Sequence, residues 1–459
     1  MDYVHFFKDK KITVMGLGLL GRGVGDILFL AQQGVQEIIV TDLKNEEELR
    51  ESVEKIQHLP NVTLVLGEHR ISDFRDRDFI LKAAGVPFDS KYIREAQKHN
   101  VPVYMSSALF CMFYPGKIIG ITGTRGKTTT THLIYQGLKR AGKKVFLGGN
   151  IQGVSTLAHL PDATEDEVAV LELDSWQLQG FGEIEKSPHI AVFTNLLVDH
   201  LNYYKREGVD DEVALNRYFS DKANIFRFQK EEDVLVIGEQ VVKKIEDVFG
   251  LKRIRSAVMT TSKEDVPEGW NVQIPGEHNR ANIACALEVL RVCNISEEVI
   301  QESVEKFRGV SGRLEFVREV SGIKIYNDTT ATTPDATLAG LQALRESHTD
   351  ARIILIGGGA DKKLDMKSLA QRIPEYCSHV FLLSGTGTDV FVPQLLIENN
   401  EHQTVISKPF DSLSQAVHEA MNVAKEGDII LFSPGFASFG MFKNEYDRGE
   451  QFNTLVEVL

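Results

Sequence analysis

A glycine-rich turn between a buried strand and a helix leaves this chain few possible folds. The turn, residues 120–130, reads Gly-Ile-Thr-Gly-Thr-Arg-Gly-Lys-Thr-Thr-Thr, and the apolar run at 117–122 leads into it. Residues 128–142 then have the apolar spacing of a helix. This order is that of a P-loop, in which backbone N–H groups and a helix N-terminus surround phosphate oxygens. It predicts a nucleotide site at the edge of a parallel α/β sheet.

The residue types in this turn suit ATP or GTP. Lys127 can reach the outer phosphates, and the hydroxyl of Thr128 or Thr129 can hold magnesium. Ile121 stands where the strict P-loop pattern has its first glycine, and a glycine directly precedes it. The alternative is an ordinary tight turn from strand to helix.

Composition narrows the remaining classes. A length of 459 residues suggests three domains. Because the chain has no apolar run of about 18 residues and no signal-peptide core, we expect a cytoplasmic protein. A formal charge of −14 argues against nonspecific binding to nucleic acid or to anionic membranes. The 4 cysteines are scattered without a C-x-x-C pair, which favours packing roles over a zinc site or disulfides.

Residues 1–106 have the pattern of a small Rossmann-like domain. Strand-like runs at 11–15 and 37–42 enclose a helical stretch and the turn Gly16-Leu-Gly-Leu-Leu-Gly21, so the segment is a βαβ unit with G-x-G-x-x-G. An acidic residue, Asp42, ends the second strand. Three interpretations stay open: a dinucleotide cofactor site, a site for a nucleotide-diphosphate substrate, and a close-packed turn without a ligand.

Residues 107–311 continue the parallel sheet of the P-loop, with apolar strands at 144–147, 168–173 and 190–195. Polar groups follow two of these strands, namely Glu172 and the run from Asn195 to His200. Ligands gather at the carboxyl ends of parallel strands, so a carboxylate and an imidazole there can serve a magnesium ion. The other interpretation of His200 is a loop histidine without a metal.

Lys222 occupies a position on the apolar stripe of a predicted helix, with Tyr218 and Ile225 at helical spacing. A buried, unpaired ammonium is costly. Either the side chain extends to solvent, or its chemistry is changed. Carbamylation by carbon dioxide would give it a carboxylate that can bind magnesium.

The segment Gly276-Glu-His-Asn-Arg-Ala-Asn282 enters another predicted helix. The amides of Asn279 and Asn282 can each offer a donor and an acceptor, which suits the edge of an adenine. They can equally cap the helix.

Residues 312–459 repeat the alternation of strands and helices, which predicts another doubly wound sheet. Polar loops follow its strands, at 327–330, 357–363 and 433–438. A domain with polar loops of its own indicates that a second substrate binds here.

Taken together and in order, these motifs resemble those of the Mur ligases of peptidoglycan synthesis. The matching positions cover almost the whole chain: G-x-T-G-T-x-G-K-T, Glu172, Asn195 with Asp199-His200, Lys222, G-x-H-N-x-x-N at 276–282, Arg313, Asn327-Asp328 and Ser433-Pro434. Further motifs are most similar to the members that join D-glutamate to UDP-N-acetylmuramoyl-L-alanine: Gly-Leu-Gly at 16–18, Glu-Leu-x-Ser-x-Gln-Leu at 172–178, Ala437-Ser438, Phe442-Lys-Asn444 and Arg448-Gly449.

The resemblance implies three α/β domains: a Rossmann-like domain for the uridine-nucleotide substrate at 1–106, a P-loop ATPase-like domain at 107–311, and a Rossmann-like domain for the amino acid at 312–459. It also implies ATP-dependent ligation, in which ATP phosphorylates a carboxylate and the amine of the amino acid attacks the acyl phosphate. ATP and Mg²⁺ are then required, and no nicotinamide cofactor is expected. We expect a monomer that acts on small molecules.

Roles for single residues follow from the same resemblance. The catalytic and metal-binding group would be Lys127, Thr128, Glu172, His200 and carbamylated Lys222. ATP would contact Gly123, Thr124, Arg125, Gly126, Lys127, Thr128, Thr129, Asn282, Arg313 and Asp328. The uridine nucleotide would lie near Gly18, Leu19, Gly21 and Asn150, and the carboxylates of glutamate near Lys362 and Ser438.

Several positions depart from the pattern of those members. Thr330 stands where a lysine is usual, Arg125 replaces an asparagine, Asp174 replaces a serine, and Gly312 replaces the histidine before Arg313. In the first domain, hydroxyl-bearing or Ser-Pro residues are replaced by Leu20, Leu43 and Ala83-Ala84. These departures bear on the uridine contacts and on the stereochemistry of glutamate more than on ligation itself.

Three alternatives remain beside this prediction. The first is a Mur-type ligase that uses L-glutamate, another amino acid or another acceptor. A P-loop kinase or GTPase is the second, although the chain lacks the Asn-Lys-x-Asp guanine motif. The third is a noncatalytic nucleotide-sugar-binding protein, which would leave Lys127 and Glu172 without a role.

Overall fold

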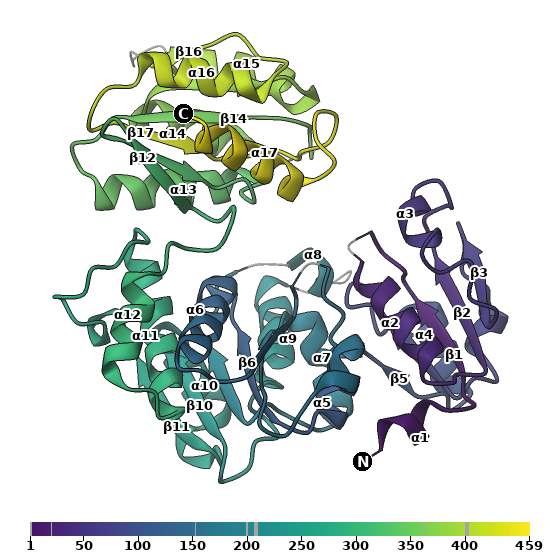
Figure 1. The fold of residues 1–459 in the computed structure, drawn as a ribbon. Helices are drawn as coiled ribbons and strands as arrows, with labels where there is room; N and C mark the ends of the chain where they lie inside the picture. The colour runs from purple at the N-terminus through teal and green to yellow at the C-terminus, as the bar shows by residue number, and fades with distance from the viewer. Residues whose placement is uncertain are drawn as a thin grey trace. The chain divides into compact units, whose positions relative to one another are not determined.

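The computed structural model describes residues 2–19, 21–151, 153–198, 201–205, 210–362, 364–399 and 404–459. It divides into two compact units, Met1–Val266 with Ala281–Ile300, and Pro267–Arg280 with Gln301–Leu459. Two sheets belong to the first unit and one to the second, which confirms the predicted α/β class with three sheets (Figure 1). The exact domain boundaries stay a prediction. Within the described residues, no helix has the length and apolar character that crossing a bilayer requires.

Five parallel strands form the first sheet, in the order β3-β2-β1-β4-β5. The strands are β1 (Lys11–Met15), β2 (Glu37–Asp42), β3 (Val62–Leu66), β4 (Phe79–Lys82) and β5 (Val103–Tyr104). The helices of this part are α1 (Tyr3–Phe7), α2 (Arg22–Gln32), α3 (Arg50–Val53) and α4 (Lys91–Lys98). Because β1 lies in the middle, the glycine turn at 16–21 leaves the centre of the carboxyl edge; Leu20 lies outside the described residues.

Six parallel strands form the middle sheet, in the order β11-β10-β9-β6-β8-β7. The strands are β6 (Lys117–Thr122), β7 (Val145–Gly149), β8 (Val168–Glu172), β9 (Ile190–Phe193), β10 (Val234–Gly238) and β11 (Ala257–Thr261). The helices are α5 (Ser106–Phe113), α6 (Lys127–Arg140), α7 (Ser175–Glu183), α8 (Leu201–Tyr204), α9 (Asp211–Ala223), α10 (Glu239–Phe249), α11 (Glu277–Val292) and α12 (Glu297–Glu305). The P-loop therefore leaves the middle of this sheet, from β6.

Burial explains why these runs form strands. Ile119, Val170 and Val192 lie on neighbouring strands of the middle sheet and are fully buried. Their apolar neighbours point to the opposite face and are buried as well, since helices cover both faces of a parallel sheet. These neighbours, Ile118, Leu171 and Phe193 among them, belong to one buried cluster that also contains residues of the first sheet. The two sheets of the first unit therefore share a continuous apolar interior.

The third sheet has six strands in the order β12-β13-β17-β14-β15-β16. Its strands are β12 (Glu315–Val320), β13 (Ile323–Asn327), β14 (Ile353–Gly358), β15 (Cys377–Leu383), β16 (Val405–Ile406) and β17 (Ile429–Phe432). Its helices are α13 (Pro334–Ser347), α14 (Lys367–Tyr376), α15 (Thr386–Glu398), α16 (Leu413–Val423) and α17 (Glu445–Glu457). All pairs are parallel except β12 with β13, which form a hairpin through Ser321 and Gly322, both with positive φ.

Candidate active site

The P-loop (residues 120–128) leads into α6, which begins at Lys127. Gly126 is the N-cap residue of α6, with a φ of 79° in the left-handed region that favours glycine. A Cβ at Gly126 would lie 1.9 Å from Oδ1 of Asn282, so a larger residue would displace that side chain. The structure thus places Asn282, a predicted ATP contact, directly against the P-loop.

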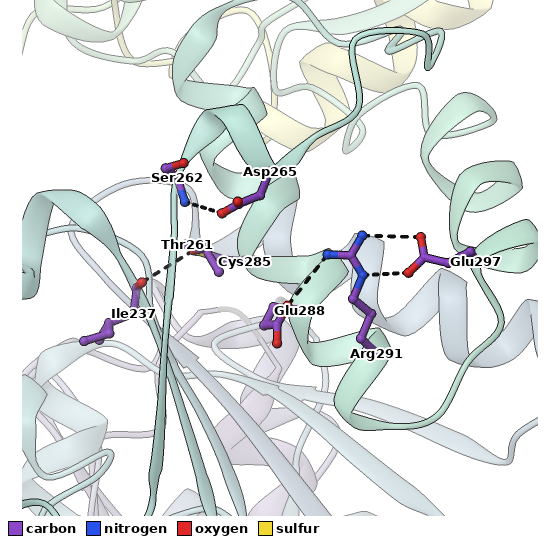
Figure 2. Close-up of polar contacts among 8 residues, drawn as sticks. All are labelled: Ile237, Thr261, Ser262, Asp265, Cys285, Glu288, Arg291 and Glu297. Atoms are coloured by element: carbon purple, nitrogen blue, oxygen red, sulfur yellow. Dashed lines mark hydrogen bonds and ion pairs between the residues drawn. The ribbon is translucent and has the colours of Figure 1, made fainter.

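The hydroxyl of Thr130 on α6 donates to the carbonyl of Asn282 at 3.2 Å, and further polar contacts of α11 lie along the helix (Figure 2). The hydroxyl of Thr261, at the end of β11, lies 3.2 Å from Sγ of Cys285 on α11. Arg291, near the end of the same helix, donates to both carboxylate oxygens of Glu297, at 2.6 and 3.3 Å. Burial raises the pKa of Cys285 to about 11, which agrees with the predicted packing role of this cysteine.

Asn195, after β9, clamps the P-loop through its amide. The backbone N–H of Arg125 donates to Oδ1 of Asn195 at 2.9 Å, and Nδ2 of Asn195 donates to the carbonyl of Arg125 at 3.1 Å. The N–H of Thr124 donates to the carbonyl of Asn195 at 2.9 Å. Since these contacts use only the backbone of Arg125, they are compatible with the departure from asparagine at that position.

The ammonium group of Lys127 turns back onto its own loop. It donates to the carbonyls of Gly123 and Thr124, at 3.0 and 3.1 Å. Thr128 and Thr129 follow in the first turn of α6, where the backbone N–H groups have no partner within the helix and the helix dipole is positive. Phosphate oxygens can therefore replace the two carbonyls as the acceptors of Lys127.

Glu172 ends β8, in register with Ile121 on β6, and is only 3% exposed. Its Oε1 accepts a hydrogen bond from Nδ2 of Asn150 at 3.3 Å. Its Oε2 is buried and has no hydrogen-bond partner in the described part of the chain. A buried carboxylate oxygen without a donor is costly unless a cation or donor arrives, so this atom fits the predicted magnesium site.

Asp174, another departure, begins α7. Its side chain accepts from the N–H of Gln177 at 2.7 Å, and the side chain of Gln177 accepts from the N–H of Asp174 at 3.2 Å. This reciprocal pair is a capping box. Aspartate caps a helix as well as serine does, so the replacement preserves the start of the helix that follows Glu172.

Lys222 is buried, with 1% of its surface exposed, and does not extend to solvent. Its Nζ donates to the carbonyl of Gly123 at 2.8 Å and lies 3.3 Å from Oγ1 of Thr122. It also lies 4.7 Å from the ring centre of Tyr218. The interpretation of Lys222 as a lysine that extends to solvent is wrong, because its helix, α9, packs this side chain against the P-loop.

The predicted magnesium ligands are only partly visible in the structure. His200 and Asp199 lie outside the described residues. Among the residues that are described, no three histidines, cysteines or carboxylates cluster as a metal site would require. The predicted set has Glu172 as its only carboxylate unless Lys222 is modified, so the fit of a metal rests on the free oxygen of Glu172.

The glycine turn of the first sheet is held by a carboxylate. Oδ2 of Asp42 accepts from the N–H groups of Leu17 and Gly18, at 2.9 and 3.1 Å. Oδ1 accepts from the N–H of Lys44 at 3.0 Å. Both oxygens of Asp42 thus accept from the backbone, three bonds in all, so this carboxylate has a role in holding the turn.

A cavity of about 200 Å³ opens above this turn. Gly18 and Leu19, predicted to lie near the uridine nucleotide, line it together with Arg22 and Gly149. Gly21, with a φ of 80°, is the N-cap residue of α2. Asn150, predicted to lie near the same ligand, contacts Arg22 and Glu172 through its side-chain amide. Sequence reasoning missed Arg22, since no motif includes it.

In the second unit, Asp328 follows β13 and is 8% exposed. It accepts from the N–H of Leu314 at 3.0 Å and from the hydroxyl of Ser433 at 2.8 Å. Burial raises the pKa of this carboxyl to about 7, although its two hydrogen bonds and the nearby Arg313 act to lower it. The predicted nucleotide residues Arg313 and Asp328 are therefore neighbours.

The predicted glutamate residues also lie on neighbouring loops. Ala360 and Ala437 exchange backbone hydrogen bonds, at 2.9 and 3.2 Å, and so join the loops that carry Lys362 and Ser438. Nζ of Lys362 donates to Oγ1 of Thr332 at 2.7 Å. Partial burial lowers the pKa of Lys362. The two residues predicted to hold the carboxylates of glutamate thus lie on joined loops at the carboxyl edge of the third sheet.

Arg448 is a residue of this region to which sequence reasoning gave no role. It is fully buried on α17 and donates to the carbonyls of Thr329 and Phe436, at 2.8 and 3.2 Å. Burial lowers its pKa to about 10. The guanidinium joins the loop of Asp328 to the loop of Ser438. The motif Arg448-Gly449 was the available signal, but burial of an arginine is not visible in a motif.

Two departures, Thr330 and Gly312, contact each other. The N–H and the hydroxyl of Thr330 donate to the carbonyl of Gly312, at 3.0 and 2.9 Å. Gly312 has a φ of 72°, and a Cβ there would lie 2.6 Å from Cγ2 of Thr329. The histidine that is usual at this position therefore would not fit beside this threonine pair.

The parallel sheet, the P-loop and the buried Glu172 beside it define a P-loop nucleotide-binding enzyme. The Mur ligase middle domain matches residues 121–290, and the Mur ligase glutamate ligase domain matches residues 312–436. This chain belongs to the Mur ligase family.

Full-length relatives agree with that assignment. The chain is 36% identical to the UDP-N-acetylmuramoylalanine–D-glutamate ligase of Roseiflexus sp. (strain RS-1), over 98% of both chains. It is 34% identical to the enzyme of the same name from Borreliella burgdorferi (strain ZS7), again over 98% of both.

Solved structures show the same fold at low identity. The UDP-N-acetylmuramate–alanine ligase MurC of Thermotoga maritima is 18% identical, with a TM-score of 0.58 over 98% of this chain and 99% of that one. The MurF ligase of Thermotoga maritima, in complex with ADP, is 17% identical, with a TM-score of 0.55 over 99% and 97%. The predicted family and fold class are therefore confirmed.

Proposed function

We propose that this chain joins D-glutamate to UDP-N-acetylmuramoyl-L-alanine in an ATP-dependent reaction of peptidoglycan precursor synthesis. The observation that carries the proposal is Glu172, whose unpartnered buried oxygen lies beside the strand that leads into the P-loop. The names of the full-length relatives support the choice of substrates. The partners are then small molecules, and we expect a cytoplasmic monomer.

Phosphoryl transfer comes first. A carboxylate oxygen of the acceptor attacks the γ-phosphorus of ATP, the bond to the β-phosphate oxygen breaks, and ADP leaves. Lys127 exchanges the carbonyls of Gly123 and Thr124 for phosphate oxygens, and Asn195 keeps the loop in the shape that α6 requires. Positioning and electrostatic stabilisation supply most of the rate in such transfers.

Amide formation follows at the resulting acyl phosphate. The amine of glutamate attacks the acyl carbon and loses a proton, and the tetrahedral intermediate expels phosphate. Lys362 and Ser438 would hold the carboxylates of glutamate, and Arg448 keeps their loops in place. Asp328 and Arg313 are expected to contact the nucleotide, as the family pattern implies.

Magnesium would be held by Glu172, Thr128, His200 and a carbamate on Lys222, and it would neutralise charge on the transferring phosphoryl group. Carbamylation joins the neutral amine of Lys222 to carbon dioxide and releases one proton. The ammonium form instead donates to Gly123, so the two forms make opposite demands on that carbonyl. A carbamate carbon signal after incubation with ¹³C-bicarbonate, absent in Lys222→Arg, would support this ligand; the same spectrum in both would exclude it.

Phosphate release tests the function. Purified protein receives ATP, magnesium and UDP-N-acetylmuramoyl-L-alanine, with D-glutamate, L-glutamate or no amino acid. Release that depends on D-glutamate supports the proposal. Release with L-glutamate alone keeps the ligase but changes its stereospecificity, whereas no release with any amino acid contradicts the proposed activity.

A further inference from the structure

Three side chains form a polar connection from the first sheet to the middle sheet. Arg22, the first residue of α2, donates from Nη1 to Oδ1 of Asn150 at 3.1 Å. Nδ2 of Asn150 donates to Oε1 of Glu172 at 3.3 Å, and the N–H of Asn150 donates to the carbonyl of Glu172 at 2.7 Å. The residue at the start of the helix beside the first glycine turn is therefore two contacts away from the carboxylate of the proposed phosphoryl-transfer site.

Asn150 can couple the positions of Arg22 and Glu172, because its amide oxygen contacts one and its amide nitrogen the other. Its oxygen accepts from Arg22, so its nitrogen faces Glu172. The bond from that nitrogen occupies Oε1 and leaves Oε2 as the free atom. If Arg22 moves, the Asn150 amide loses the donor that fixes which way its oxygen and nitrogen face.

Arg22 keeps most of its hydrogen-bonding capacity. A guanidinium has five N–H donors, and the bond to Asn150 uses one of them. Asp26, one helical turn away, accepts from the hydroxyls of Ser106 and Ser155. The charge of Arg22 acts on Asp26 and lowers its pKa, and Arg22 lines the cavity above the glycine turn.

The charged residues that line that cavity are Arg22, Lys82 and Asp26, and Lys82 donates to the carbonyls of Ala83 and Val86. Asp42 places a carboxylate under the turn and occupies the N–H groups of Leu17 and Gly18, which are groups that elsewhere bind phosphate. A diphosphate above the turn would therefore meet fewer free N–H groups and a negative charge below them. Arg22, at the N-terminal end of α2, supplies a positive charge on the cavity wall.

We propose that Arg22 binds the diphosphate of the nucleotide substrate with its remaining donors while Nη1 holds Asn150, so that occupation of the diphosphate site orients Glu172. The inference rests on the proposed function and names Arg22 as a positioning residue that acts on Glu172 through Asn150. Binding energy from the remote diphosphate then contributes to the phosphoryl-transfer step as well as to affinity.

Kinetics of Arg22→Ala and Arg22→Lys test the proposal, with Arg50→Ala as the matched control on the first sheet. Arg50 is an exposed arginine that pairs with Glu47 at 3.8 Å. We expect Arg22→Ala to raise KM for the nucleotide substrate about 30-fold, to lower kcat about tenfold and to raise the magnesium concentration for half-maximal rate. Arg22→Lys keeps a point charge but lacks the planar fork, so KM recovers more than kcat.

Asn150→Ala supplies the second arm. If Arg22 acts through Asn150, the double variant Arg22→Ala/Asn150→Ala shows no larger change in kcat and magnesium requirement than the larger single variant. Additive losses contradict the connection. So does an Arg22→Ala protein with raised KM but wild-type kcat and magnesium dependence.

Binding measurements separate this inference from the proposed activity. Calorimetry with UDP-N-acetylmuramoyl-L-alanine, and with N-acetylmuramoyl-L-alanine that has no diphosphate, needs no turnover. We expect Arg22→Ala to weaken only the first ligand. If wild-type protein binds the first ligand but releases no phosphate, the proposed ligase activity fails, and selective weakening of that ligand in Arg22→Ala still supports diphosphate binding by Arg22. Equal loss of affinity for both ligands in Arg22→Ala contradicts diphosphate binding by Arg22. If Arg22→Ala does not fold, Arg22→Lys carries the same comparison.

Discussion

The two glycine turns of the first unit have similar backbone conformations at their helix caps, but different side chains hold them in place. Gly21 and Gly126 cap their helices with φ values of 80° and 79°, and each is followed by a cation, Arg22 or Lys127. The P-loop is clamped by a neutral amide, that of Asn195, and Lys127 turns back onto the loop. The first turn is held by a carboxylate, and its arginine reaches outward to Asn150. We propose that the same local fold serves phosphoryl transfer at the P-loop and binding of the nucleotide substrate at the first glycine turn.

Of the variants in the two glycine turns, the one that removes the lysine of the P-loop should cause the largest loss. In Lys127→Ala we expect kcat/KM for phosphate release to fall about 10³-fold, or about 4 kcal/mol, because the variant lacks the ammonium that exchanges its loop carbonyls for phosphate oxygens. The matched control is Lys139→Ala, in the last turn of the same helix and exposed. A loss below tenfold in Lys127→Ala would show that this lysine does not act in phosphoryl transfer.

Alanine substitutions at the two N-cap glycines should separate the cost of a left-handed backbone from the cost of a steric clash with Asn282. Gly126→Ala adds the cost of a left-handed φ to a Cβ that would meet Asn282 at 1.9 Å, so we expect ATP affinity to fall about 100-fold, or about 3 kcal/mol. Gly21→Ala has the same φ, but its Cβ would lie 3.7 Å from Cα of Gly153, so only the strain of about 1 kcal/mol remains. Calorimetric ATP binding and thermal unfolding measure both. Equal losses would mean that Asn282 yields without cost.

Much of this arrangement was predictable from the sequence. Apolar runs of strand length that end in glycine or carboxylate residues located β1, β6 and β8, and hence the P-loop and Glu172. Such signals are local: they need only the spacing of neighbouring residues. The hairpin of β12 with β13 was not predicted, because strand direction depends on the pairing partner rather than on the spacing of apolar residues.

Side-chain partners far apart in the chain were not predictable. Arg448 and Thr329 lie 119 positions apart, and Arg22 and Asn150 lie 128 apart. No local pattern distinguishes these arginines from exposed ones. For Lys222, the helical stripe located the lysine on an apolar face, but only packing of α9 against the P-loop decides that the ammonium meets Gly123 rather than solvent.

The helix after the first glycine turn, α2, also carries Asp26, which should make the stability of the protein depend on pH. Burial raises the pKa of Asp26 to about 6, while its two serine hydrogen bonds and Arg22 act to lower it. Between about pH 4 and pH 6 the folded protein holds one more proton than the unfolded chain, so the free energy of unfolding falls as pH rises through this range. The contribution of Asp26 to that fall is about 3 kcal/mol, and it ends above the folded pKa.

Urea unfolding of Asp26→Asn at pH values from 4.5 to 7.5 tests this. The stability of the variant relative to wild type should rise with pH up to about 6 and then stay constant. Ser155→Ala is the matched control: it removes a hydrogen bond that lowers the pKa of Asp26, so the fall should extend to higher pH. A pH-independent difference between Asp26→Asn and wild type would show that the carboxyl is not perturbed.

The smallest expected effect concerns the support beneath the first glycine turn. Asp42→Asn leaves one acceptor oxygen for the N–H groups of Leu17, Gly18 and Lys44, so we expect a loss of about 1 kcal/mol in stability. Because the variant also removes negative charge below the proposed diphosphate, KM for the nucleotide substrate should not rise. A carboxylate that contacted the ribose directly would behave in the opposite way: its loss would raise KM more than tenfold at nearly unchanged melting temperature. Asp42→Asn therefore decides whether Asp42 stabilises this turn or contacts the ligand directly.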